Sequence, residues 1–81
     1  MIDEETYTIS EPVIDAIEGG MPAIHAFRQH DGRSAYDVAT AAGITEERMA
    51  ILERGSDNAT NAELDALNEV LDVPRDLLID E

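Results

Sequence analysis

The sequence predicts an all-α fold of about five or six short helices in one small domain. Three observations support this. Apolar residues recur three and four positions apart, a capping residue precedes most of these stretches, and glycine or proline separates them. The chain has 81 residues, of which 43% are hydrophobic, which suits a single domain with one small core.

An acidic leader of residues 1–21 is expected to precede the main helical domain at residues 22–81. Residues 6–9 alternate weakly between apolar and polar types, which fits either a short strand or an extended arm. Ser10 can cap a short helix that has Pro12 in its first turn and ends at a glycine pair. The apolar side of this helix consists of Val13, Ile14 and Ile17.

Two further helices follow the leader. The first begins at Pro22 and directs Ile24 and Phe27 inward. The second begins at Ser34, which is expected to form a capping box with Asp37. The small, flat inner face of this second helix, which permits close packing, consists of Val38, Ala39 and Ala42.

The next segment predicts a turn and another helix, which ends at Gly55. Gly43 supplies the positive φ at which the preceding helix ends, and Thr45 caps the new one. Two glutamates in its first turn suit the positive end of the helix dipole. The residues that face the core here are Ile44, Met49 and Leu52. Two helices joined at a single glycine in this way are typical of a helix-turn-helix.

The last part of the chain predicts one longer helix and one short one. Thr60 and Glu63 form a capping box at the start of the longer helix, and the short helix begins at Pro74. The apolar residues that these two helices present are Leu64, Leu67, Leu71, Leu77 and Leu78.

A family pattern runs in register through the predicted turn. The residues that carry it are Arg28, Gly32, Ser34, Val38, Ala39, Gly43, Ile44, Thr45, Met49, Leu52, Glu53 and Gly55, followed by Leu64, Leu67, Leu71, Val73, Pro74 and Leu77. Through them the chain resembles the lambda-repressor-like, XRE-type helix-turn-helix family over residues 22–79. The preceding stretch, VIDAIEGGMPAIHAFRQHDG, is similar to the segment before the motif in helix-turn-helix antitoxins of toxin–antitoxin pairs.

The resemblance implies a lambda-repressor-like domain of about five short helices, with an N-terminal arm and an extra short helix. It implies a transcriptional regulator that binds double-stranded operator DNA sequence-specifically as a homodimer. The similarity to antitoxins extends this to autoregulation and a toxin partner. The implied DNA-binding residues are Arg33, Ser34, Ala35, Thr45, Glu46, Glu47, Arg48, Ala50, Ile51 and Arg54. Arg28 and Glu53 are implied to form a structural ion pair.

The side chains at three of the implied DNA-binding positions indicate how strongly the chain can contact DNA. Ala35 stands where the family usually has a glutamine that holds a phosphate. Arg48 is the one standard reader of base edges or phosphates among the central positions of the second motif helix, so we expect it to matter most. Ile51 can contact a thymine methyl group, although an exposed apolar residue more often marks contact with another chain.

The charge of the chain opposes DNA binding. Nineteen acidic residues stand against five arginines and no lysine, which gives a formal net charge of −14. Residues 22–55 are near neutral, and the excess of acid lies before and after them. This pattern is compatible with DNA binding, with a basic protein partner, or with a high-salt cytoplasm. The alternative function is therefore a protein-interaction module of the same fold that binds a basic toxin with little or no DNA binding.

No enzyme activity, metal or cofactor is expected. His25 and His30 lie five residues apart, on different sides of a helix, and no H-E-x-x-H or Ser/His/Asp pattern accompanies them. The absence of cysteine excludes disulfides and thiolate zinc sites. No signal-peptide pattern or membrane-length apolar run is present, so we expect a cytoplasmic protein without membrane contact. A homodimer is expected because the leader and the last helix carry more apolar residues than so small a domain requires.

Overall fold

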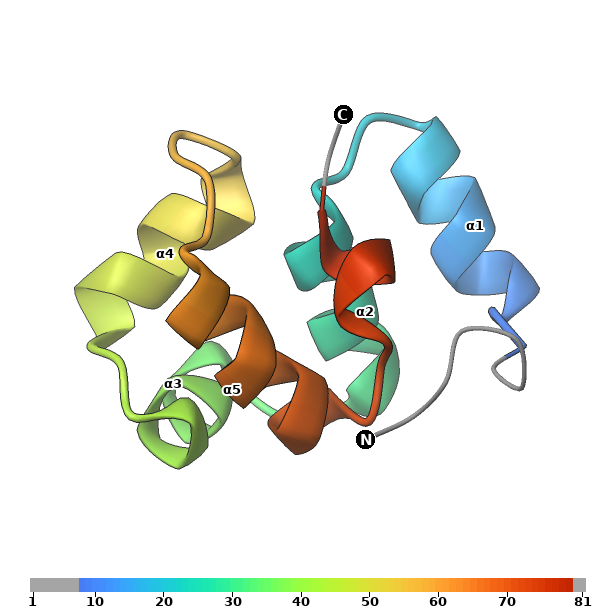
Figure 1. Ribbon diagram of the computed structural model, residues 1–81. Coiled ribbons are helices and arrows are strands. Elements are labelled where there is room, and N and C mark those ends of the chain that lie inside the picture. Colours follow the sequence, from blue (N-terminus) through green and yellow to red (C-terminus); the bar gives the residue numbers. More distant parts are fainter. Residues whose placement is uncertain (1–7, 80–81) are drawn as a thin grey trace.

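The computed structural model describes residues 8–79, and all regular structure within that range is helical (Figure 1). The elements, in order, are α1 (Glu11–Glu18), α2 (Ala23–Asp31), α3 (Ala35–Ala42), α4 (Glu46–Arg54), α5 (Asn61–Leu71) and the short 3-10 helix η2 (Arg75–Leu78). The predicted all-α fold is confirmed. Residues 6 and 7 of the possible strand or arm lie outside the described residues, and Thr8 and Ile9 are not in a strand.

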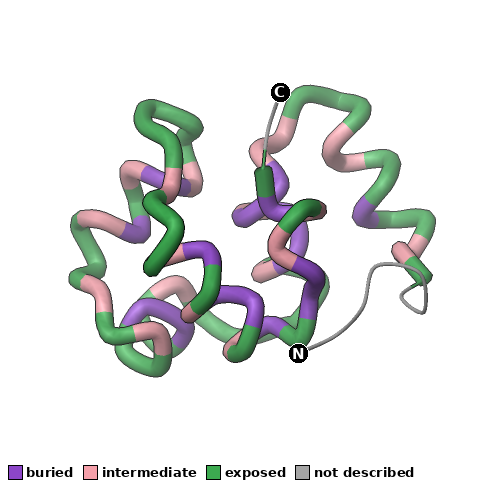
Figure 2. The backbone as a smooth tube through the Cα atoms, viewed as in Figure 1, coloured by how far each residue is buried: buried purple, intermediate pink, exposed green. Residues whose placement is uncertain are grey.

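The hydrophobic core lies where α2, α4, α5 and η2 converge, and α3 closes it on one side (Figures 1 and 2). Val38, Met49 and Leu67 have no exposed surface and mark the centre of this core. The apolar periodicity of the sequence correctly predicted which positions of α2, α3, α4 and α5 point inward. The predicted inward residues that are fully buried are Ile24, Phe27, Val38, Ala39, Met49, Leu52, Leu64, Leu67 and Leu71.

Helix α1 belongs to the same core as the rest of the domain. It packs on α2, and its Val13 is buried there, while Ile17 is partly buried against the core and Ile14 is exposed. At the other end of the chain Leu78 is buried and Leu77 is partly buried. The expectation that these segments carry surplus apolar surface was therefore mostly wrong, because the domain itself covers most of that surface.

The predicted helix caps are present in three of four cases. Thr45 and Ser34 each accept a hydrogen bond from the third residue of their helix, at 3.0 Å in both, and Thr60 forms the full reciprocal capping box with Glu63. The capping box predicted at Ser34 is incomplete. The hydroxyl of Ser34 accepts the hydrogen bond from the backbone N–H of Asp37, but the reciprocal bond from the Ser34 backbone to the Asp37 side chain is not formed. The cap predicted at Ser10 was wrong, since its hydroxyl lies 3.0 Å from Nε2 of His30 instead.

The turn from α5 into η2 is held by a residue that no sequence pattern marked. Asn68 is buried at 2% exposure, and its side-chain amide donates a hydrogen bond to the backbone carbonyl of Val73. A buried carbonyl without such a donor would lose its solvation uncompensated. Asn68 thus fixes the chain reversal that lets η2 fold back onto α2 and α5.

Candidate nucleic-acid interface

Helices α3 and α4 pack against each other and are joined by a turn that contains Gly43 at a φ of 75°. Met49 and Leu52 anchor the inner side of α4 in the core. With 3.6 residues per turn, the opposite side of α4 presents one continuous outer face. We define the α4 outer face as Glu46, Glu47, Ala50, Ile51 and Arg54.

The residues predicted to contact DNA gather around this face but are unequally accessible. Seven of them are exposed: Arg33, Ser34, Thr45, Glu46, Glu47, Ala50 and Arg54. Ala35, Arg48 and Ile51 are only partly exposed, and Ala35 packs against the core. Ile51 does not pack against the core, so its apolar side chain remains available at the edge of the α4 outer face.

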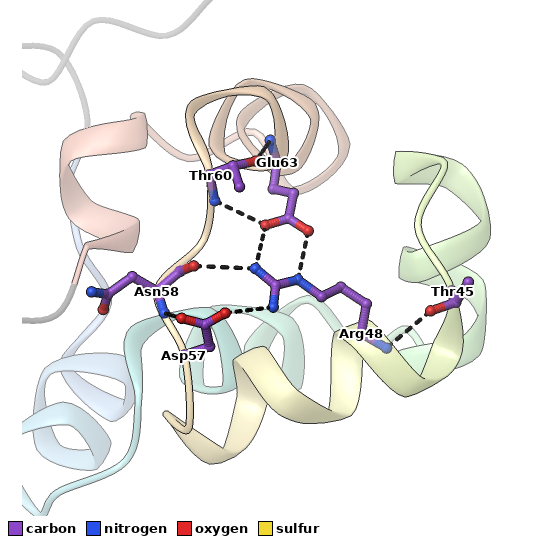
Figure 3. Close-up of polar contacts among 6 residues, drawn as sticks. All are labelled: Thr45, Arg48, Asp57, Asn58, Thr60 and Glu63. Atoms are coloured by element: carbon purple, nitrogen blue, oxygen red, sulfur yellow. Dashed lines mark hydrogen bonds and ion pairs between the residues drawn. The ribbon is translucent and has the colours of Figure 1, made fainter.

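Arg48 turns away from solvent toward the loop that leads into α5 (Figure 3). Its Nε and Nη2 donate to the two carboxylate oxygens of Glu63 at 2.7 and 2.9 Å. Its Nη1 donates to Asp57 at 2.9 Å, and Nη2 also donates to the backbone carbonyl of Asn58 at 3.2 Å. All three guanidinium nitrogens are therefore engaged within the molecule, and 24% of the side chain is exposed.

Glu63 links this network to the start of α5. Its carboxylate also accepts a hydrogen bond from the backbone N–H of Thr60 at 2.8 Å, which completes the helix cap (Figure 3). Hydrogen bonds from the guanidinium of Arg48 hold the pKa of Glu63 and the pKa of Asp57 below their ordinary values. These carboxylates in turn raise the pKa of Arg48.

Acid is expected to destabilise the domain through this network. Because the pKa of Glu63 is lower in the folded state, its contribution is present above the ordinary value of 4.5 and is lost as the pH falls through the folded-state pKa. We expect Glu63→Gln to flatten the dependence of the unfolding free energy on pH between about pH 5 and 3, measured by urea titration. The control is Glu69→Gln, an exposed glutamate of the same helix. Equal pH dependence in the two variants would contradict the assignment.

The ion pair expected between Arg28 and Glu53 is present and joins α2 to the end of α4. Two parallel hydrogen bonds form it, from Nε to Oε2 at 2.5 Å and from Nη2 to Oε1 at 3.0 Å. The side chains are 16% and 10% exposed. Arg28 also donates to the backbone carbonyl of Arg33, and Nε2 of His25 lies 3.9 Å from Glu53.

The remaining arginines decide how much positive charge the surface offers. Arg33 donates to Asp31 and to the backbone carbonyl of Val70, and Arg75 donates to Asp65 at 2.8 Å. Arg54 is exposed and has no ion-pair partner among residues 8–79. Within the described part of the chain, every other arginine is bound to a carboxylate.

One exposed residue near the candidate interface was missed by sequence reasoning. Tyr36, in the first turn of α3, is 60% exposed, the largest exposed fraction among the large apolar residues between positions 8 and 79. Its position was readable from the sequence, because Val38 and Ala39 define the inner side of α3 and leave Tyr36 outside.

Comparison with known proteins identified no relative. No protein-family model matches the chain, and no curated protein or solved structure matches it either. Among residues 8–79, no group of three or more histidines and acidic residues is placed to hold a metal ion. No helix in the same range has the length and apolarity of a membrane span.

Proposed function

We propose that the chain is a lambda-repressor-like helix-turn-helix domain that binds a basic protein partner through the α4 outer face. The observation that supports this proposal is that Arg48 is hydrogen-bonded to Glu63 and Asp57, so its positive charge is not presented on the α4 outer face. The exposed charges that remain in the first turn of α4 are the carboxylates of Glu46 and Glu47. A surface of this sign attracts and orients a cationic partner.

The α4 outer face also offers apolar contact. Ala50 is exposed and Ile51 is partly exposed, one turn beyond the two glutamates. An amphipathic helix with arginine or lysine beside an apolar stripe would meet carboxylates at one end of this face and aliphatic side chains at the other. A small basic toxin is the class of partner that this chemistry suits, in agreement with the similarity to antitoxins.

DNA reading by the same helix is the second candidate, and the turn between α3 and α4 favours it. Ser34 and Thr45 cap the two helices. The outer side of α4 is exposed, so it can enter the major groove of DNA. Affinity would be weak, because Arg54 is the one arginine among residues 8–79 without a carboxylate partner. Each phosphate contact steepens the fall of the DNA-binding constant with salt, on a log–log plot, by about 0.9. With Arg54 as the contact, we expect a slope of about that size per subunit.

One titration separates the two candidates. The protein is titrated with a lysine-rich amphipathic peptide and, separately, with duplex DNA from upstream of its own coding sequence, each at several salt concentrations. We expect peptide binding that weakens about tenfold in the double variant Glu46→Gln, Glu47→Gln, since two facing charges are lost. The control variant, Asp15→Asn with Glu18→Gln, removes two exposed charges from α1 and should bind as the wild type does.

DNA binding in the same experiment is expected to be weak and to lack sequence preference. Tight, sequence-specific DNA binding with a salt slope steeper than about one per subunit would overturn the proposal in favour of the second candidate. Peptide binding that is equal in both double variants would remove the α4 outer face as the binding site.

A further inference from the structure

The α4 outer face carries charges of opposite sign at its two ends. Glu47 and Arg54 are seven residues apart, which is close to two full helical turns, so both lie on the same side of α4. The helical rise of about 1.5 Å per residue separates them by about 10 Å along the helix axis. Ala50 and Ile51 lie between them, about one turn from each end. The face therefore runs from acid through an apolar middle to base along α4.

Both charged ends of this face are available to a partner. Arg54 is exposed, and no carboxylate among residues 8–79 forms an ion pair with it. Glu46 and Glu47 are exposed at the other end, and no basic side chain in the described part of the chain pairs with either. The two opposite charges are therefore presented separately, and a partner meets both.

We propose, on the basis of the proposed function, that the partner segment is a helix with an acidic residue about seven positions before a basic one and an apolar stripe between them. Residues three, four and seven positions apart share one side of a helix, so this spacing matches the α4 outer face. Acid near the start of a helix and base near its end also suit its own dipole. The segment lies antiparallel to α4, because that direction places its base at Glu47 and its acid at Arg54.

Arg54 makes this face selective among basic segments. A helix with lysine at both ends puts a like charge opposite Arg54, and like charges across an interface oppose binding. A second copy of this chain also suits the face less well than a basic partner. Two chains of net charge −14 repel each other, whereas the excess of acid attracts a partner that is basic overall.

Two peptides of identical composition and net charge test this assignment. Both are amphipathic helices that are basic overall and have lysine at the C-terminal end of the apolar stripe. The aligned peptide has a glutamate seven residues before that lysine, on the same side. The displaced peptide has the glutamate exchanged with a glutamine on the opposite side of the helix. We expect the wild type to bind the aligned peptide about tenfold more tightly in isothermal titration calorimetry, since only this peptide pairs with Arg54.

Variants of the protein show whether Arg54 causes the preference. Arg54→Gln should bind the two peptides equally, and Arg54→Glu should prefer the displaced peptide, because the aligned glutamate then meets a like charge. The control is Arg75→Glu, which changes the net charge as Arg54→Glu does but lies on η2. It should keep the tenfold preference. Circular dichroism checks that each variant is folded.

The direction of the bound helix is tested with a nitroxide label at the lysine end of the aligned peptide. The label should broaden the backbone N–H signals of Glu46 and Glu47 in NMR spectra more than the signal of Gly55. The opposite pattern, equal binding of the two peptides by the wild type, or a preference that survives Arg54→Gln would overturn this inference and leave the proposed function in place. Binding of neither peptide would overturn both. An apparent dissociation constant that rises with protein concentration would assign the face to a second copy and overturn the inference.

Discussion

Replacing Arg28 by alanine is expected to lower the free energy of unfolding by about 3 kcal/mol, toward the lower end of the roughly 3 to 5 kcal/mol seen when a buried pair loses one partner. The reason is that Glu53, with 10% of its side chain exposed, would keep a charge without its bidentate donor. Glu53→Ala should cost a similar amount. A domain of this size has about 5 kcal/mol of stability, so either variant would be partly unfolded near 37 °C.

A double-mutant cycle tests whether the two residues act as a pair. Urea unfolding of Arg28→Ala, Glu53→Ala and the double variant should show a coupling energy above about 1 kcal/mol. The control is Arg75→Ala, because Arg75 and Asp65 form a pair whose side chains are 35% and 54% exposed. That variant should lose less than about 1 kcal/mol. Small and additive losses at Arg28 and Glu53 would show that the pair has no structural role.

Replacing Arg48 by methionine is expected to lower the midpoint of thermal unfolding by about 5 to 10 °C. Methionine keeps the aliphatic stem but removes every hydrogen bond to Glu63, Asp57 and the carbonyl of Asn58. The loop between α4 and α5 would then lose its side-chain link to α4 and keep the cap of α5 and the packing of Ala59 against the core. Differential scanning calorimetry at pH 7 measures the change.

The matched control for Arg48 is Arg54→Met on the same helix. Arg54 is exposed and has no ion-pair partner among residues 8–79, so its loss should change the thermal midpoint of the monomer very little. Arg48→Met should also leave any DNA binding unchanged, because the guanidinium of Arg48 points toward Glu63 and Asp57 and away from the α4 outer face. A fully stable Arg48→Met variant that loses DNA binding would assign Arg48 to the interface and overturn its structural role.

Local sequence signals determined where the helices lie and which sides they bury. Thr60 and Glu63 are three residues apart, and Gly43 needs only its own lack of a side chain to adopt a φ of 75°. The spacing of Met49 and Leu52 likewise places both on the inner side of α4. Such features depend on residues within about one helical turn, so the sequence alone was sufficient for them.

The tertiary structure alone decided which charged and polar side chains are available. Arg48 was expected on the outer face of α4, yet the carboxylates that hold it come from residues 9 and 15 positions along the chain. Ser10 was expected to cap α1, yet its hydroxyl contacts His30, 20 positions away. Arginine carries five N–H donors on a long, flexible stem, so it binds whichever acceptors the fold brings within hydrogen-bond distance. Helix spacing cannot show those acceptors, because Asp57 and Glu63 approach Arg48 only when the loop after α4 and the start of α5 fold back beside it.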